Sequence, residues 1–157
     1  MLARVAENLY WMGRQLERAE NTARLVNATT QVLLDSPAGI ELGWDELTRV
    51  MGFPNVNPSS SGVTETEVVR LLLLDQDNPG SIVVSLRHAR ENARSLREVL
   101  PREVWEQLNN LHLRAPALMT AALDRSRRHA ALREVVDARL LLAGLLNETM
   151  SHDAAFQ

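Results

Sequence analysis

Apolar residues recur along most of the chain in alternating steps of four and three. Near the N-terminus these residues are Val5, Leu9, Met12, Leu16, Ala19, Ala23 and Val26. The spacing returns in Ile82, Leu86, Ala89, Ala93, Leu96 and Leu100, and again in Val104, Leu108, Leu111, Ala115, Leu118 and Ala122. Such spacing keeps one apolar stripe of a helix turned toward a neighbouring helix. It predicts an all-α fold, an antiparallel helical bundle of about four to six helices, three of them long with heptad-like seams.

Proline, glycine and capping residues predict the ends of these helices. We expect helices over about residues 3–34, 44–51, 65–74, 79–100, 102–122 and 131–148. Thr64 and Glu67 form a capping-box pattern. Asn78 is the expected N-cap of the fourth helix, with Pro79 at its first position.

Three further features carry local predictions. Residues 53–63 hold two prolines and three consecutive serines, which predicts a flexible loop. Gly13 lies in the middle of a helix, which suggests that a neighbour approaches closely there. The second half of the last helix is apolar nearly all round, so we expect it to be central or covered by a partner.

The bulk composition indicates one ordinary globular domain over residues 1–157, with 45% hydrophobic and 24% charged residues. The net charge of −3 and the lack of a uniformly basic face argue against nucleic acid. The longest apolar run, residues 140–146, is far shorter than the roughly 20 residues of a membrane span. The N-terminus does not resemble a signal peptide, so a cytoplasmic location is expected.

All 17 basic residues are arginine. Compositional bias of the genome accounts for this, and arginine also suits ion pairs inside a bundle. When the first long helix is aligned with residues 82–100 at an offset of 70, Glu17 falls on Arg87 and Glu20 on Arg90. We therefore predict that these acids pair with the arginine row of residues 87, 90, 94 and 97 across a helix–helix seam.

The same polar residues have a second interpretation, as a pocket for a small molecule or a peptide carboxylate. The candidate binding residues are Glu7, Asn8, Arg14, Glu17, Arg18, Glu20, Asn21, Arg87, Arg90, Glu91, Asn92 and Arg94. Tyr10 and Trp11 offer an aromatic wall for such a pocket, although packing in a core or an interface is the interpretation that we favour.

Catalytic and metal-binding patterns are not assembled by this sequence. A di-metal carboxylate bundle needs Glu-x-x-His pairs, which do not occur. His88-x-x-Glu91 is a weaker pattern, and His112 is better explained by packing than by base chemistry. The chain has no cysteine and no glycine-rich phosphate loop. We predict no catalytic residue, no metal and no cofactor.

The opening segment, residues 4–14 followed by Leu16-Glu17-Arg18-Ala19-Glu20-Asn21, resembles the bacterial alpha-E domain family, which takes its name from a Glu-Arg pair. Residues 77–82, 86–94 and 100–106 resemble the family in the same order. The resemblance covers nearly the whole chain. It implies that members are usually about twice as long, so that this chain resembles an N-terminal half.

The resemblance also implies partners, because family members are typically encoded beside, or fused to, a circularly permuted ATP-grasp protein and a transglutaminase-like cysteine peptidase. We therefore expect a non-catalytic accessory or scaffold domain of a system that forms or modifies peptide bonds. A carboxylate-binding domain or enzyme with a Glu/Arg/Asn pocket is one alternative. A homodimerisation module is another.

Overall fold

The structure, a computed structural model, describes residues 2–36, 42–52 and 64–152. The predicted loop at 53–63 lies outside these residues. The described residues form helices and turns, with the order α1 (Leu2–Asp35), α2 (Leu42–Val50), α3 (Glu65–Leu73), α4 (Ile82–Arg94), α5 (Arg102–Ala121) and α6 (Arg125–His152). The predicted all-α class is confirmed.

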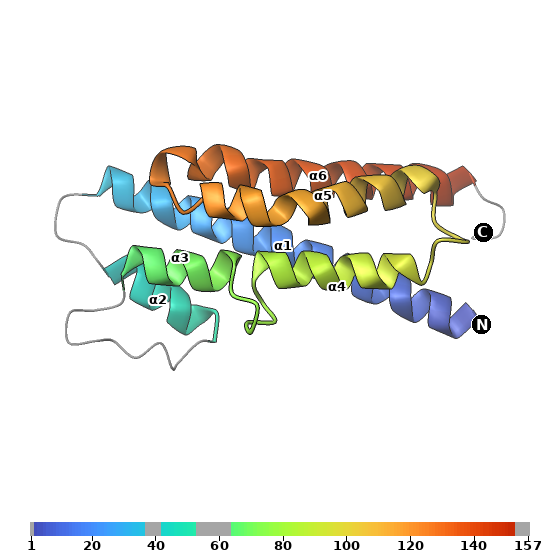
Figure 1. The fold of residues 1–157 in the computed structure, drawn as a ribbon, viewed down its shortest axis with the longest axis horizontal. Coiled ribbons are helices and arrows are strands. Elements are labelled where there is room, and N and C mark those ends of the chain that lie inside the picture. The colour runs from blue at the N-terminus through green and yellow to red at the C-terminus, as the bar shows by residue number, and fades with distance from the viewer. Residues whose placement is uncertain (1, 37–41, 53–63, 153–157) are drawn as a thin grey trace.

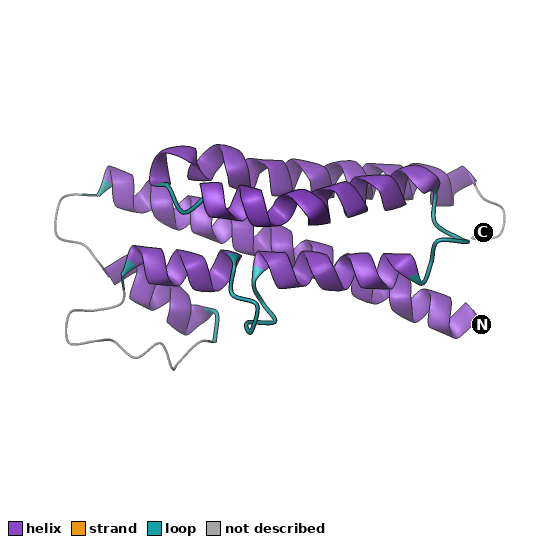
Figure 2. Ribbon diagram, in the orientation of Figure 1, coloured by secondary structure: helices purple, strands orange, loops and turns teal. Residues whose placement is uncertain are grey.

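The bundle is built from α1, from α3 followed by α4, from α5 and from α6, which lie side by side as columns (Figure 1). α1 packs against α4 and against α6, and α5 also packs against both α4 and α6. Neighbouring columns run in opposite directions, and α3 precedes α4 along one side of the bundle. α2 contacts α1 and α3 at the end of the bundle away from the two termini (Figure 2).

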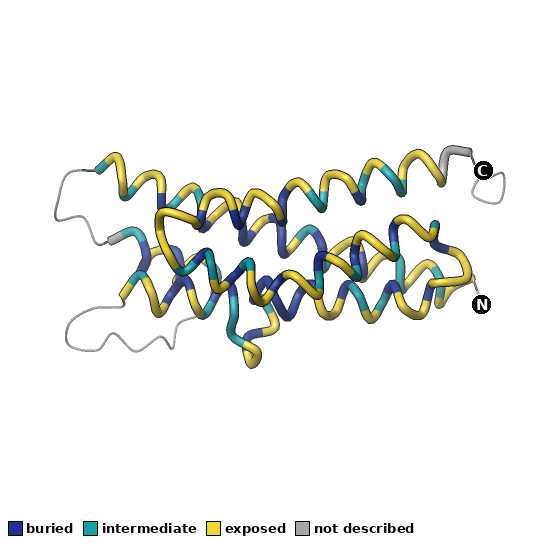
Figure 3. Tube along the Cα trace, turned by 45° about the horizontal axis from the view of Figure 1, so that its top comes forward, coloured by how far each residue is buried: buried dark blue, intermediate teal, exposed yellow. Residues whose placement is uncertain are grey.

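The predicted seams form the core. Met12, Leu16, Ala19, Ala23 and Val26 of α1 are buried, as are the seam positions of α4 and most of those of α5. Val5, Leu9 and Leu118 are partly buried and pack against this core. Buried positions therefore recur along the inner side of each helix (Figure 3). Burial of these apolar surfaces is the main contribution that holds the helices together.

Helix ends agree with the capping prediction at α3 and differ at α4. Thr64 and Glu67 form the expected capping box, with the Glu67 carboxylate accepting from the Thr64 amide at 3.0 Å. Ser81, and not Asn78, is the N-cap of α4, because its Oγ accepts from the Val84 amide. Asn78 is buried and donates to the Leu71 carbonyl at 2.9 Å, so it secures the end of α3.

Two further predictions are wrong in part. Nothing lies within 4 Å of a Cβ built on Gly13, so no neighbour requires glycine there. In α6, Leu142 is buried, but Leu140 and Leu141 are about half exposed. The apolar second half of α6 is therefore not central, because it contacts other helices on one side only. Coverage by a partner stays a prediction.

Candidate functional site

A groove of about 420 Å³ runs along the outward face of α1. The residues of α1 that line it follow one another at helical spacing, and Met51, directly after α2, completes it. The lining is Tyr10, Trp11, Arg14, Gln15, Glu17, Arg18, Asn21, Thr22, Leu25 and Met51. The groove thus extends over about four turns of one helix.

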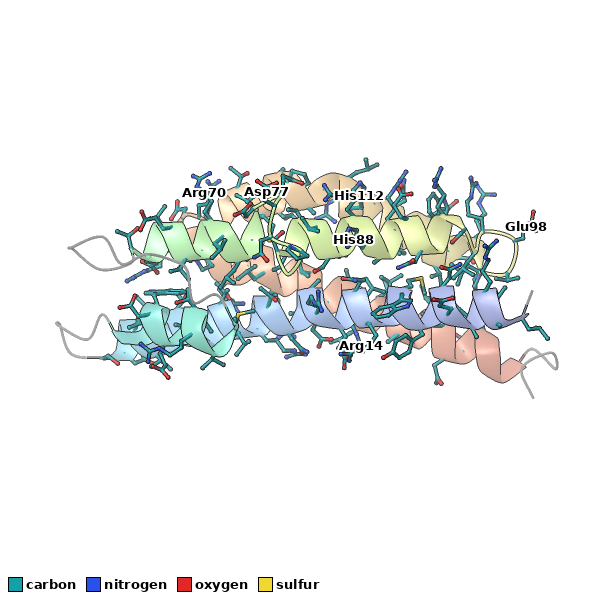
Figure 4. The ribbon with its side chains drawn as sticks, turned by 90° about the horizontal axis from the view of Figure 1, so that it is seen from below. Arg14, Arg70, Asp77, His88, Glu98 and His112 are labelled. Carbon is teal, nitrogen blue, oxygen red and sulfur yellow. The ribbon has the colours of Figure 1, made fainter. Side chains whose placement is uncertain are left out.

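Helical periodicity explains why these side chains share a face. The buried seam takes one side of α1, and Trp11, Arg18 and Leu25 recur seven residues apart on a second stripe. Seven residues are nearly two complete turns, so the three side chains lie almost in line along the helix. Arg14 points away from the bundle on this side (Figure 4).

The Glu-Arg pair does not form an internal salt bridge. Glu17 accepts a hydrogen bond from Arg14 Nη1 at 2.6 Å, and both side chains are about half exposed. Consecutive helical residues point about 100° apart, so Arg18 is turned away from Glu17. Within the part of the chain that the structure describes, Arg18 makes no hydrogen bond or ion pair. Its guanidinium therefore has free donors in the groove.

A second polar atom in the groove lacks a partner. The Oε1 atom of Gln15 is buried and accepts no hydrogen bond within the described ranges. A buried carbonyl oxygen without a donor is unfavourable unless a ligand or water satisfies it. Of these two residues, Arg18 presents free donors to the groove, whereas the Oε1 atom of Gln15 is enclosed by the protein.

Aromatic and aliphatic side chains form the walls. Tyr10 and Trp11 are 58% and 47% exposed and meet edge to face, with 5.3 Å between ring centroids. Leu25 is 40% exposed at the other end of the α1 stretch. The expectation that the aromatic pair packs in a core is wrong, because both residues fall off the buried seam, whereas packing in an interface stays a prediction. The alternative of an aromatic wall agrees with the structure.

The predicted pairs Glu17–Arg87 and Glu20–Arg90 do not form. Arg87 donates to Gln76 at 2.8 Å, whereas Glu20 binds Arg24 and, at 3.0 Å, Arg139 of α6. α1 and α4 do pack, but they are antiparallel (Figure 1). In an antiparallel pair, residue numbers rise along one helix while they fall along the other. Two residues face each other only where their numbers add up to the same total, so pairs separated by a fixed offset do not all face each other.

The arginine row interacts mostly with its own helix and with α5. Glu91 accepts from Arg90 at 2.8 Å and from Arg94 at 3.1 Å. Arg90 also donates to Asn109, and the guanidinium groups of Arg90 and Arg97 stack on Trp105. The row is therefore largely occupied by contacts within the bundle.

His112, on α5 beside this row, is partly buried (Figure 4). Burial lowers the pKa of His112, and the positive charge of Arg90 lowers it further. A neutral, packed imidazole agrees with the packing role that the sequence suggests.

Four of the predicted binding residues line the groove, namely Arg14, Glu17, Arg18 and Asn21. The others, Glu7, Asn8, Glu20, Arg87, Arg90, Glu91, Asn92 and Arg94, do not. The predicted set lacks four other residues that line the groove, namely Gln15, Thr22, Leu25 and Met51. The heptad spacing of Trp11, Arg18 and Leu25 is the signal that indicates the stripe, whereas Met51 comes from the turn after α2 and has no such signal.

No three or more His, Cys, Asp or Glu side chains in residues 2–36, 42–52 and 64–152 are grouped so that they hold a metal ion. Across the same ranges, every helix is too short or too polar to cross a bilayer.

The fold and groove define an antiparallel helical bundle with a polar-aromatic groove on its first helix. The chain belongs to the Alpha-E family, described as a predicted alpha-helical domain with a conserved ER motif, and the match covers residues 1–157. The sequence holds one Glu-Arg dipeptide, Glu17-Arg18, so the motif lies in the groove.

Two similar proteins come from mycobacteria. The uncharacterized proteins Mb2597 of Mycobacterium bovis and Rv2567 of Mycobacterium tuberculosis are each 28% identical to this chain over 98% of its length. The chain spans 20% of the length of each relative. A comparison with solved structures gives no significant match.

Proposed function

We propose that this chain is a non-catalytic accessory domain that binds a partner protein through the groove on α1. One observation carries the proposal. Arg18 of the Glu-Arg motif lines an open groove and has no intramolecular partner within the described residues. Arg139, by contrast, is held in an ion pair with Glu20 and contributes to the scaffold. Free guanidinium donors in a groove are suited to recognition.

The partners belong to the same proposal. The family resemblance suggests a circularly permuted ATP-grasp protein and a transglutaminase-like cysteine peptidase, in a system that forms or modifies peptide bonds. The relatives are consistent with this suggestion, because four fifths of their length lies outside the part that matches this chain. A cytoplasmic location is included in the proposal, since an ATP-dependent partner needs the cytoplasmic supply of ATP.

Isothermal titration of the purified chain with the ATP-grasp protein from the same locus tests the proposal. We expect binding that Arg18→Ala weakens by about tenfold or more, because hydrogen bonds to a charged group contribute roughly 1.5–3 kcal/mol. Arg70→Ala is the matched control. Arg70 is also an exposed helical arginine with no side-chain bond to another described residue, and it lies on α3 outside the groove.

Two results would contradict the proposal. One is that the titration gives no heat of binding and that size-exclusion chromatography of the mixed proteins shows no complex. The other is an equal loss of binding in the Arg18 and Arg70 variants, which would place the interface elsewhere. Self-association is checked in the same chromatography, since the exposed Leu140 and Leu141 offer a second apolar surface.

A further inference from the structure

We infer that the surface formed by the end of α4, the turn after it and the start of α5 binds a phosphate group through Arg90, Arg94 and Arg97. This surface contains none of the residues that line the groove on α1, so the inference is independent of the proposed function. It follows from the way in which the three guanidinium groups are held, from their uncompensated charge and from the donors that they leave free.

Glu91 and Trp105 hold the three guanidinium groups close together. Glu91 accepts from Arg90 at 2.8 Å through one carboxylate oxygen and from Arg94 at 3.1 Å through the other. The guanidinium carbons of Arg90 and Arg97 lie 5.5 and 5.0 Å from the centroid of the Trp105 ring. Arg90 is thus held near Arg94 by the acid and near Arg97 by the ring. Like charges held in this way repel one another, and an anion that contacts them removes the repulsion.

The cluster carries more positive charge than its bonded acid neutralises. Three arginines share the single negative charge of Glu91, so a charge of +2 remains. Within the part of the chain that the structure describes, Arg97 makes no hydrogen bond or ion pair, and the neighbouring Glu98 makes no ion pair with the cluster. Most other arginines of the described residues are paired with an acid, as Arg102 is with Glu106.

The remaining contacts fix the guanidinium groups without neutralising them. Arg90 donates from Nε to the neutral amide of Asn109 at 2.8 Å, and Arg87, one turn earlier on α4, donates to the neutral amide of Gln76 at 2.8 Å. The pKa of His112 is lowered by its burial and, in addition, by the charges of Arg90 and Arg87. This direction agrees with an excess of positive charge on this side of the bundle.

The charge and the free donors favour a phosphate group over a carboxylate. A guanidinium has five N–H donors, and within the described ranges Arg94 uses only its Nε and Arg97 uses none. Both side chains are exposed. A phosphate monoester has three terminal oxygens and a charge of about −1.5 to −2 at neutral pH, so it accepts from several guanidinium groups at once. A carboxylate has two oxygens and one charge, which a single guanidinium satisfies.

The test titrates inorganic phosphate, N-acetyl-phosphoserine amide and acetate, each separately, into the ¹⁵N-labelled full chain at constant ionic strength. The indole signals of Trp11, Trp44 and Trp105 are followed. We expect both phosphate compounds to shift the Trp105 signal and to leave the other two unchanged, and acetate to bind at least about tenfold more weakly. Tighter binding of the phosphoserine compound assigns the site to a phosphorylated side chain of a partner. Equal or tighter binding of inorganic phosphate assigns it to a small phosphate ligand.

Variants locate the contact. Arg94→Ala and Arg97→Ala should each bind inorganic phosphate at least about tenfold more weakly, because each removes charged donors from the site. Arg70→Ala is the matched control, since it removes an exposed arginine on α3 that has no side-chain bond to another described residue. It should bind phosphate as the unmodified chain does. Circular dichroism of the three variants checks that each is folded, as their exposed positions predict.

Three results would overturn the inference. One is phosphate that binds no more tightly than acetate. Another is an Arg94→Ala and an Arg97→Ala variant that bind phosphate as tightly as the unmodified chain. The third is a shift of the Trp11 signal in place of the Trp105 signal, which would place the anion in the groove on α1.

Discussion

Arg128 of α6 binds Glu65 of α3 from inside the bundle, with 2.7 Å between Nη1 and Oε1, and the Arg128 side chain is only 2% exposed. The same guanidinium donates to Thr30 Oγ1 of α1 at 3.0 Å and to the carbonyl of Ala122, which follows α5, at 2.8 Å. The Trp44 ring of α2 lies against it. One buried side chain thus connects α6 with α1, α2, α3 and the end of α5.

Arg128→Ala should destabilise the fold by about 3–5 kcal/mol, because it removes the buried one of the two arginines that bind Glu65 and takes the donor from the carbonyl of Ala122 and from the Thr30 hydroxyl. The measurement is the free energy of unfolding in urea. Arg127→Ala is the control, since Arg127 is exposed and pairs with Asp124 one turn away. A loss of less than about 1 kcal/mol in Arg128→Ala would show that the bundle does not depend on this contact.

Acid should weaken the fold partly through Glu65. Burial opposes its ionisation, but hydrogen bonds from Arg125 and Arg128 outweigh burial, so the pKa of Glu65 lies below its ordinary value. Because the pKa of Glu65 is lower in the folded state, its ionised carboxylate stabilises the fold at every pH above the ordinary pKa, near 4.3. This stabilisation is lost as the pH falls through the lowered pKa of the folded state.

Glu65→Gln should therefore reduce the stability measured near neutral pH and reduce the further loss of stability on acidification. Urea unfolding of both proteins at neutral pH and below pH 4 or so measures the difference. Glu46→Gln, which alters a surface pair with Arg49, is the control. The same acid dependence in Glu65→Gln and in the unmodified chain would assign the acid sensitivity to other carboxylates.

Gly13→Ala and Gly144→Ala should each raise the stability by up to about 1 kcal/mol. Both glycines lie inside long helices, and nothing lies within 4 Å of a Cβ added at either position. Alanine lowers the conformational entropy of the unfolded chain without a steric conflict in the helix. Thermal unfolding followed by circular dichroism measures the change, and a lower melting temperature in Gly13→Ala would show that the chain does not accommodate the added methyl group there.

Glu17→Ala and Glu20→Ala should reduce the free energy of unfolding by different amounts, although each removes a carboxylate from α1 and the two positions are three residues apart. Glu20 is 10% exposed and binds Arg24 of α1 and Arg139 of α6, so its loss leaves Arg139 unpaired and should cost about 2 kcal/mol or more. Glu17 is 43% exposed and binds Arg14 alone, so its loss should cost less than about 1 kcal/mol. Equal losses in urea unfolding would contradict this distinction.

The fold class follows from the sequence because it depends on local periodicity. The spacing of Met12, Leu16, Ala19 and Ala23 sets one buried stripe on α1 whatever the partner helix is, and the other two seams do the same for α4 and α5. The capping box at Thr64 and Glu67 is also local, and the structure confirms it. The Glu-Arg motif and the family follow from sequence for the same reason, since both are read along the chain.

The charged contacts depend on helix direction, which periodicity does not contain. A constant offset paired Glu17 with Arg87, but α1 and α4 pack antiparallel, so residues at a constant offset do not face one another, and Glu17 binds Arg14 of its own helix instead. The sequence pattern does not indicate the role of Arg128, because its partners Thr30 and Glu65 are 98 and 63 residues away along the chain. Residues close together in the sequence determine where each helix lies along the chain and which side of it is apolar. Which polar side chains form ion pairs between helices is determined only by how the helices pack in the tertiary structure.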